Sequence, residues 1–170
     1  MVIAQLEEFF DYKNKLMEDI LTDETIVKLI NEEATLETAD KLKYTQVFPA
    51  HYIPETVHDG STFVCFDVDI IAAPNKTFYK PVIYIWILAH RSRLRLPEGG
   101  VRTDKLCSEI CKKINGSKYY GLGELSLYSS KIYAPMTDYT GKVLTFDTTD
   151  FNRPGDSRTR SIPSNRKDGT

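Results

Sequence analysis

The chain has 170 residues, of which 41% are apolar and 27% are charged, and this composition is typical of one soluble globular domain. Its formal net charge of −2 excludes a strong general attraction of the whole molecule to nucleic acid or to an anionic membrane. The longest apolar run, residues 81–89, is much shorter than the roughly 18 residues that a membrane-spanning helix needs.

The N-terminal part of the chain is predicted to be helical. Its apolar residues recur at spacings of three and four, which predicts an amphipathic helix over residues 2–21. Thr22 or Asp23 can cap a second, short helix over residues 24–30. Residues 31–43 are polar and indicate no single type of structure.

The middle of the chain predicts strands. Residues 44–54 contain two prolines, which cannot donate to a strand ladder, so they predict an edge strand or an extended connection. After a turn at 58–61, residues 61–73 alternate apolar and polar side chains as a strand does. A turn at 74–76 joins this strand to a second one, which begins at Thr77, and the two predict an antiparallel hairpin.

One helix and two further strands complete the predicted set of elements. Thr103 is expected to cap a helix over residues 103–115, and Gly116 is expected to end it. Strands are predicted over residues 123–134 and 142–151, with a turn at 138–141 between them. The buried stripe of the helix is predicted to consist of Leu106, Cys107, Ile110, Cys111 and Ile114.

This order of elements predicts an α+β fold, with N-terminal helices, an antiparallel sheet with a long hairpin, and one helix packed on the sheet. Residues 1–152 are expected to form a single domain, in which 1–43 are helical and 44–152 form the sheet and its helix. Residues 153–170 are rich in Pro, Gly, Ser and basic residues, and they predict a flexible basic tail.

The second strand of the hairpin is the most unusual feature of the sequence. Over residues 82–89 both faces are apolar, which predicts burial on both sides. Farther along, Arg91, Arg93 and Arg95 share one face. If the strand is unbroken over residues 77–96, it spans about 65 Å, which is longer than a small domain is wide.

Such an overhang predicts an arm that packs on a neighbouring subunit, because an isolated hairpin tip is only marginally stable in water. The alternative is a bulge near Ser92 and an ordinary solvated edge, whose arginines act against aggregation. The predicted interface residues are Arg91, Arg93, Leu94, Arg95, Leu96, Arg153, Arg158 and Arg160.

The sequence offers no strong motif for catalysis, cofactors or metals. Cys107 and Cys111 can supply half a metal site, but no second pair of ligands is close in sequence, so they are predicted to be core thiols. Asp67 and Asp69 share a strand face without an identifiable third acid to hold Mg²⁺. No nucleophile motif or phosphate-binding loop is present. We therefore predict no catalytic residue, no cofactor and no metal site in a protein that is not an enzyme.

A cytosolic nucleic-acid-binding module is the alternative function. The three arginines of the second strand and the basic tail can contact phosphates, and Tyr119, Tyr120 and Tyr128 can stack on bases. Against this function, the chain apart from its tail is acidic, whereas a nucleic-acid-binding domain is usually basic.

Three stretches of the sequence resemble small neck proteins of long-tailed bacteriophages, the tail-terminator or head–tail joining family. The stretches are FFDYKNKLMEDILTDETIVKLI, VIYIWILAHRSRLRLPEGGVRTDKLCSEICKKING and YYGLGELSLYSSKIYAPMTDYTGKVLTFDTTDFN. The likeness covers about residues 6–152 and lies in the order of elements and in patterned positions, not in a catalytic motif. Members of this group often lack an extended basic tail, so Asn152 to Thr170 departs from the pattern.

The resemblance implies a virion structural protein with no chemistry of its own. It implies an α+β protomer that forms a ring, commonly a hexamer, between the head connector and the tail tube. The expected partners are further copies of the chain, the adjacent neck and tail-tube proteins and, without sequence specificity, passing DNA. The expected location is the virion neck, after assembly in the cytoplasm of the host bacterium. A ring needs two complementary patches, for which the acidic N-terminal helices and the cationic arm are candidates.

Overall fold

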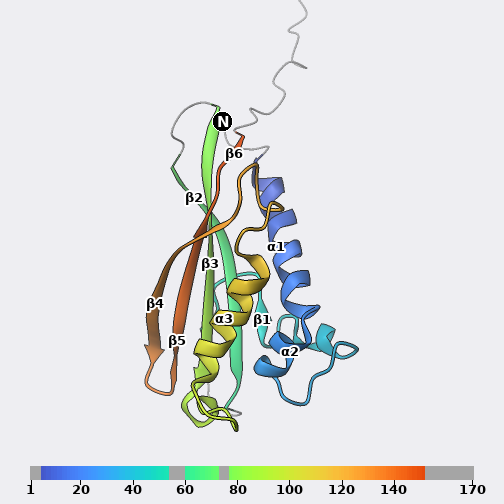
Figure 1. Ribbon diagram of the computed structural model, residues 1–170, viewed down its shortest axis with the longest axis vertical. Coiled ribbons are helices and arrows are strands. Elements are labelled where there is room, and N and C mark those ends of the chain that lie inside the picture. Colours follow the sequence, from blue (N-terminus) through green and yellow to red (C-terminus); the bar gives the residue numbers. More distant parts are fainter. Residues whose placement is uncertain (1–4, 54–59, 73–76, 152–170) are drawn as a thin grey trace, which may run out of the picture.

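The computed structural model of the chain describes residues 5–53, 60–72 and 77–151. Within these ranges, helices pack on one face of a six-stranded sheet, so the fold is α+β as predicted (Figure 1). The predicted turns at 58–61 and 74–76 lie partly or wholly outside the described residues, and the predicted tail lies wholly outside them. No helix of the described residues is both long and apolar enough to cross a membrane.

The first two helices form as the sequence predicts. Helix α1, Gln5–Leu21, buries one apolar stripe and leaves an acidic stripe exposed. Helix α2, Glu24–Ile30, is capped by Asp23, whose carboxylate accepts hydrogen bonds from the backbone N–H groups of Thr25 and Ile26. Of the two predicted capping residues, Asp23 is therefore the one used. The buried side chains of α1 are Phe9, Tyr12, Leu16, Met17, Asp19, Ile20 and Leu21.

The strand order of the sheet is β1-β2-β3-β5-β4. After a 3₁₀ turn (η1, Ala39–Leu42), strand β1, Val47–Phe48, pairs in parallel with β2 at one edge, which confirms the predicted edge strand. Strands β2, Thr62–Ala72, and β3, Phe78–His90, form the predicted antiparallel hairpin.

Strand β3 is shorter than predicted, because it ends at His90 rather than at Leu96. The chain then makes a 3₁₀ turn, η2, Arg91–Arg93. The turn is stabilised by the His90 ring, whose Nδ1 accepts the backbone N–H of Ser92, and by the N–H of Arg91, which donates to the Asp138 carbonyl at 2.9 Å. The predicted overhanging arm does not form, and the break falls near Ser92, where the alternative interpretation placed it.

Helix α3, Arg102–Ile114, starts one residue before the predicted range, and its cap differs from the prediction. Val101 is the N-cap residue and its side chain makes no capping hydrogen bond, while Thr103 lies inside the helix and is buried. The backbone supplies part of the cap instead, because the N–H of Arg102 donates to the Leu94 carbonyl at 2.7 Å. At the other end, Gly116 has a φ of +82°, as expected for a residue just beyond a helix.

The C-terminal hairpin inserts into the sheet beside β3. Strands β4, Ser126–Met136, and β5, Tyr139–Asp147, pair with each other, and β5 also pairs with β3 along nine residues. The predicted turn at 138–141 is wrong, because β5 already begins at Tyr139. The predicted last strand is divided as well, since β6, Asp150–Phe151, pairs with the other end of β3.

The two faces of the central sheet bury different clusters. Under the helices lies the main core, to which alternate residues of β2 and β3 such as Val64, Phe66 and Ile85 contribute. On the other face, Phe63 and Leu88 centre a smaller cluster. This division confirms the side-chain alternation predicted for both strands. The remaining members of the smaller cluster are Cys65 and Tyr139, with Phe48, Trp86, Tyr133 and Met136 packed against it.

Candidate interaction surface

The predicted arginine stripe is divided by the turn after β3. Arg91 lies beside Asp138 at 3.7 Å, and Arg93 lies 4.0 Å from Glu32. All three side chains of the stripe are exposed, but they no longer extend from one strand face. Exposed ion pairs of this kind contribute little to stability, so Arg91 and Arg93 are surface residues that remain accessible.

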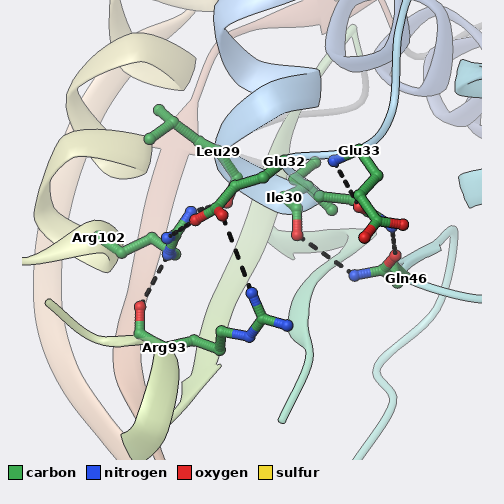
Figure 2. A network of polar contacts seen from close by, with 8 residues as sticks. Leu29, Ile30, Glu32, Glu33, Gln46, Arg93 and Arg102 are labelled. Atoms are coloured by element: carbon green, nitrogen blue, oxygen red, sulfur yellow. Dashed lines mark hydrogen bonds and ion pairs between the residues drawn. The ribbon is translucent and has the colours of Figure 1, made fainter. Parts of the chain in front are cut away.

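Arg102 organises the region behind this turn, as Figure 2 shows. Its side chain is buried and donates to the backbone carbonyls of Arg93 at 2.7 Å and Leu29 at 3.0 Å, and it pairs with the Glu32 carboxylate. One guanidinium group thus joins η2 to the last turn of α2, and it satisfies a carbonyl that a helix C-terminus leaves free. The network is a structural support, and sequence reasoning did not identify Arg102.

The other predicted interface residues differ in their burial. Leu96 is buried in the main core, 5% exposed, so its prediction as an interface residue is wrong. Leu94 is half-buried, and Arg95 is exposed in a short backbone bridge with Val101. Arg153, Arg158 and Arg160 lie outside the described residues.

Strand β4 has an open edge, although the sequence predicts only that a strand is present there. Among the described strands it pairs with β5 alone, so one side of its backbone faces outward along eleven residues. Leu127 is 41% exposed, Tyr128 73% and Ile132 83%. Long exposed edges with apolar side chains are sites where proteins associate.

A groove runs beside this edge on the face that carries the helices. Its volume is about 440 Å³, and its walls come from α3 and its floor from β4 and β5. Figure 1 shows that the helices leave this part of the sheet uncovered. The register places Leu127 opposite Phe146 and Ile132 opposite Lys142, so both side chains share this face with the groove. The groove is lined by Cys107, Ser108, Cys111, Lys112, Asn115, Leu127, Ser130 and Leu144.

Two stretches of the chain carry net charges of opposite sign. Residues 5–43, which contain α1, α2 and η1, carry eleven acidic and five basic side chains. Residues 102–142, which contain α3 and β4, carry seven basic and four acidic ones. In Figure 1, β4 lies at the left and α1 and α2 lie at the right, with α3 between them.

Two of the three thiols, those of Cys65 and Cys107, are buried. Burial raises the pKa of Cys65 to about 11 and that of Cys107 to about 12, which keeps both groups protonated at neutral pH. Cys107 packs in the main core and Cys111 packs against it, as predicted. No group of three His, Cys, Asp or Glu side chains in the described ranges is arranged to hold a metal ion.

Within the described residues, buried tyrosines hold two buried carboxylates. Asp150 accepts hydrogen bonds from the hydroxyl groups of Tyr12 and Tyr79, and Asp19 accepts one from Tyr120 at 2.8 Å. Tyr120 is fully buried, so its prediction as a base-stacking residue is wrong. Tyr119 and Tyr128 are exposed, as that function would require.

Comparison with known proteins places the chain in a family. The sequence profile of the YomW family matches residues 23–148, which is most of the chain and includes β2 to β5 and α3. The chain therefore belongs to the YomW family. This family name comes from a phage-like gene region of Bacillus, which indicates a phage-associated protein. No curated protein matches the chain.

Proposed function

We propose that this protein is a virion structural protein of the phage neck, where it forms a ring that terminates the tail tube and joins it to the head connector. Membership of a phage-associated family supports this role. The observation that carries it is the open β4 edge, where Leu127 and Ile132 are exposed beside an uncovered groove. A monomer in water gains nothing from exposing such a surface, whereas a subunit of an assembly buries it.

The proposal includes partners and location. The ring is a hexamer by likeness to tail terminators, and it contacts the adjacent neck and tail-tube proteins in the virion after assembly in the host cytoplasm. The exposed Arg91, Arg93 and Arg95 are candidates for contacts between subunits or with DNA that passes through the ring. The protein performs no chemistry in this role.

Nucleic-acid binding without assembly is the second candidate, because these three arginines and two tyrosines are exposed on the surface. Two observations reduce its support. Arg91 and Arg93 lie beside acidic side chains, and Tyr120 is buried. A binder of this kind should lose affinity steeply as salt rises, and it should remain a monomer without nucleic acid.

The mass of the protein in solution tests the proposal directly. We expect light scattering at low and high protein concentration to show a hexamer or a larger species, or a rise toward one as concentration increases. Assemblies of the proposed kind persist after nuclease treatment, whereas complexes held by nucleic acid dissociate. A strict monomer at all concentrations contradicts self-assembly into a ring.

A further inference from the structure

The proposed ring requires two different surfaces on each subunit, and the arm expected from the sequence does not form one of them. The β4 groove offers such a surface instead of the arm. We define the β4 groove by Leu127, Ser130, Leu144 and the α3 residues Cys111 and Lys112, and Ile132 is exposed beside it on the same face of β4. Its apolar floor and its open side allow a helix or a loop of another molecule to enter.

The β4 edge is unsuited to pairing with a further strand. Its register with β5 shifts between Leu127 and Ser129 and again between Tyr133 and Met136, so the strand bulges twice. Lys131 and Pro135 add a charge and a residue without an N–H group. Bulges, lysine and proline are the usual means by which an edge avoids strand pairing. A partner must therefore dock through side chains in the groove.

The outer surface of α1 is an acidic helix face that carries one exposed aromatic side chain. Its exposed stripe contains Glu7, Phe10, Asp11, Asn14 and Glu18 at helical spacing. Phe10 is 69% exposed, with acidic residues on both sides of it in sequence. This acidic helix face therefore combines one large apolar side chain with three carboxylates, an arrangement suited to an apolar groove with a basic rim.

The rim of the β4 groove is basic. Lys112 lines it and pairs with Glu109 of the same helix. Lys142 stands opposite Ile132 and pairs with Asp104, and Lys113 is exposed nearby on α3. The dimensions are also compatible, because α1 is about 26 Å long and β4 is about 36 Å long. Charge and length both favour α1 as the element that fits the groove.

We propose that the acidic helix face of one copy docks into the β4 groove of the next copy, with Phe10 as its apolar anchor. This inference rests on the proposed function and specifies its subunit contact. Because the two surfaces lie on opposite sides of the molecule, each copy uses both at once (Figure 1). Contacts of this head-to-tail type close into a ring when the rotation between copies allows it.

Two single substitutions test this contact. Ile132→Asp places a carboxylate beside the groove, on the β4 face that the partner helix would cover, and Phe10→Asp removes the anchor from the helix face. Both positions are exposed, so both variants should remain folded, which circular dichroism checks. We expect each variant alone to associate at least about 30-fold more weakly than the unmodified chain, as loss of an interface anchor does. Ile71→Asp, a change at an exposed isoleucine of β2, is the matched control and should leave assembly intact.

Mixing the two variants gives the decisive result. In an equimolar mixture, the Ile132→Asp chain offers an intact helix face and the Phe10→Asp chain offers an intact groove. We expect them to form a species with the mass of two chains and to assemble no further. Two monomers in the mixture would overturn the head-to-tail contact. Rings that persist in both single variants would overturn this contact but would leave the proposed neck-ring function intact. If the unmodified chain is a monomer, the result contradicts both the contact and the neck-ring function.

Discussion

Arg102 shows how one buried side chain fixes the position of two segments. Its guanidinium bonds to the carbonyls of Arg93 and Leu29, which are far apart in sequence. Glu32, its ionic partner, is half exposed and can be solvated by water. The contribution of the two partners to stability should therefore be unequal, because a buried polar group without partners costs much more than an exposed one.

We expect Arg102→Met to lower the free energy of unfolding by about 3 kcal/mol, because it leaves buried carbonyls without donors. Glu32→Ala should cost less than about 1 kcal/mol, since its carboxylate is accessible to water. Urea unfolding of both variants, at protein concentrations below assembly, provides the measurement. Equal losses in the two variants would show that the ion pair, and not the carbonyl contacts, stabilises this region.

The buried tyrosines predict a loss of stability at alkaline pH. Burial raises the pKa of Tyr12, Tyr79 and Tyr120 above the ordinary value of about 10, and their carboxylate neighbours raise it further. The unfolded chain therefore releases these protons first as pH rises. Their stabilisation is complete below about pH 9 and decreases above pH 10, by up to about 1.4 kcal/mol per pH unit for each tyrosine.

Urea unfolding at pH 7, 9 and 10.5 measures this dependence. The buried thiols Cys65 and Cys107 act in the same direction, since their pKa values are also raised. Tyr120→Phe removes one titrating group, so the decline above pH 10 should be shallower in that variant. A stability that stays constant between pH 9 and 10.5 would contradict the burial of these hydroxyl groups.

At the level of elements, the backbone of β3 leaves no room for a side chain at Gly141 of β5. A Cβ atom built there would lie 1.7 Å from the Ile87 carbonyl oxygen, which is impossible without moving one strand. We expect Gly141→Ala to destabilise the fold by about 3 kcal/mol. Gly116→Ala is the matched control, because its φ of +82° is strained but no atom lies near its Cβ, so it should cost about 1 kcal/mol. Thermal unfolding distinguishes the two.

The sequence predicted the elements better than it predicted their ends. The helices and the alternation of β2 and β3 follow from local periodicity, and they were confirmed. The end of β3 was missed because it depends on the His90 ring and on the Asp138 carbonyl, which comes from the distant β4–β5 turn. The β4 groove was missed for the same reason, since it exists only where α3 stops covering the sheet. Exposed arginines, by contrast, were readable directly from the sequence.

At the scale of the whole molecule, the proposed contact between the acidic helix face and the lysines beside the β4 groove predicts that assembly depends on salt. Raising NaCl from 0.1 to 1 M shortens the range of electrostatic attraction from about 10 Å to about 3 Å. We expect the dissociation constant between subunits to rise about tenfold, equivalent to about 1.4 kcal/mol. Light scattering at both salt concentrations measures it. Tighter association at high salt would indicate a contact made by apolar groups alone.

The order of strands in the sheet has a consequence for biosynthesis. Strand β5 is synthesised well after β3, with α3 and β4 between them, yet it lies beside β3 in the centre of the sheet, where Val82 pairs with Asp147. Until β5 has been synthesised, one edge of the apolar strand β3 has no partner strand in the nascent chain. Folding that waits for such distant partners is slow and exposed to aggregation. Folding of this chain in a cell should therefore gain from chaperones that shelter the incomplete sheet.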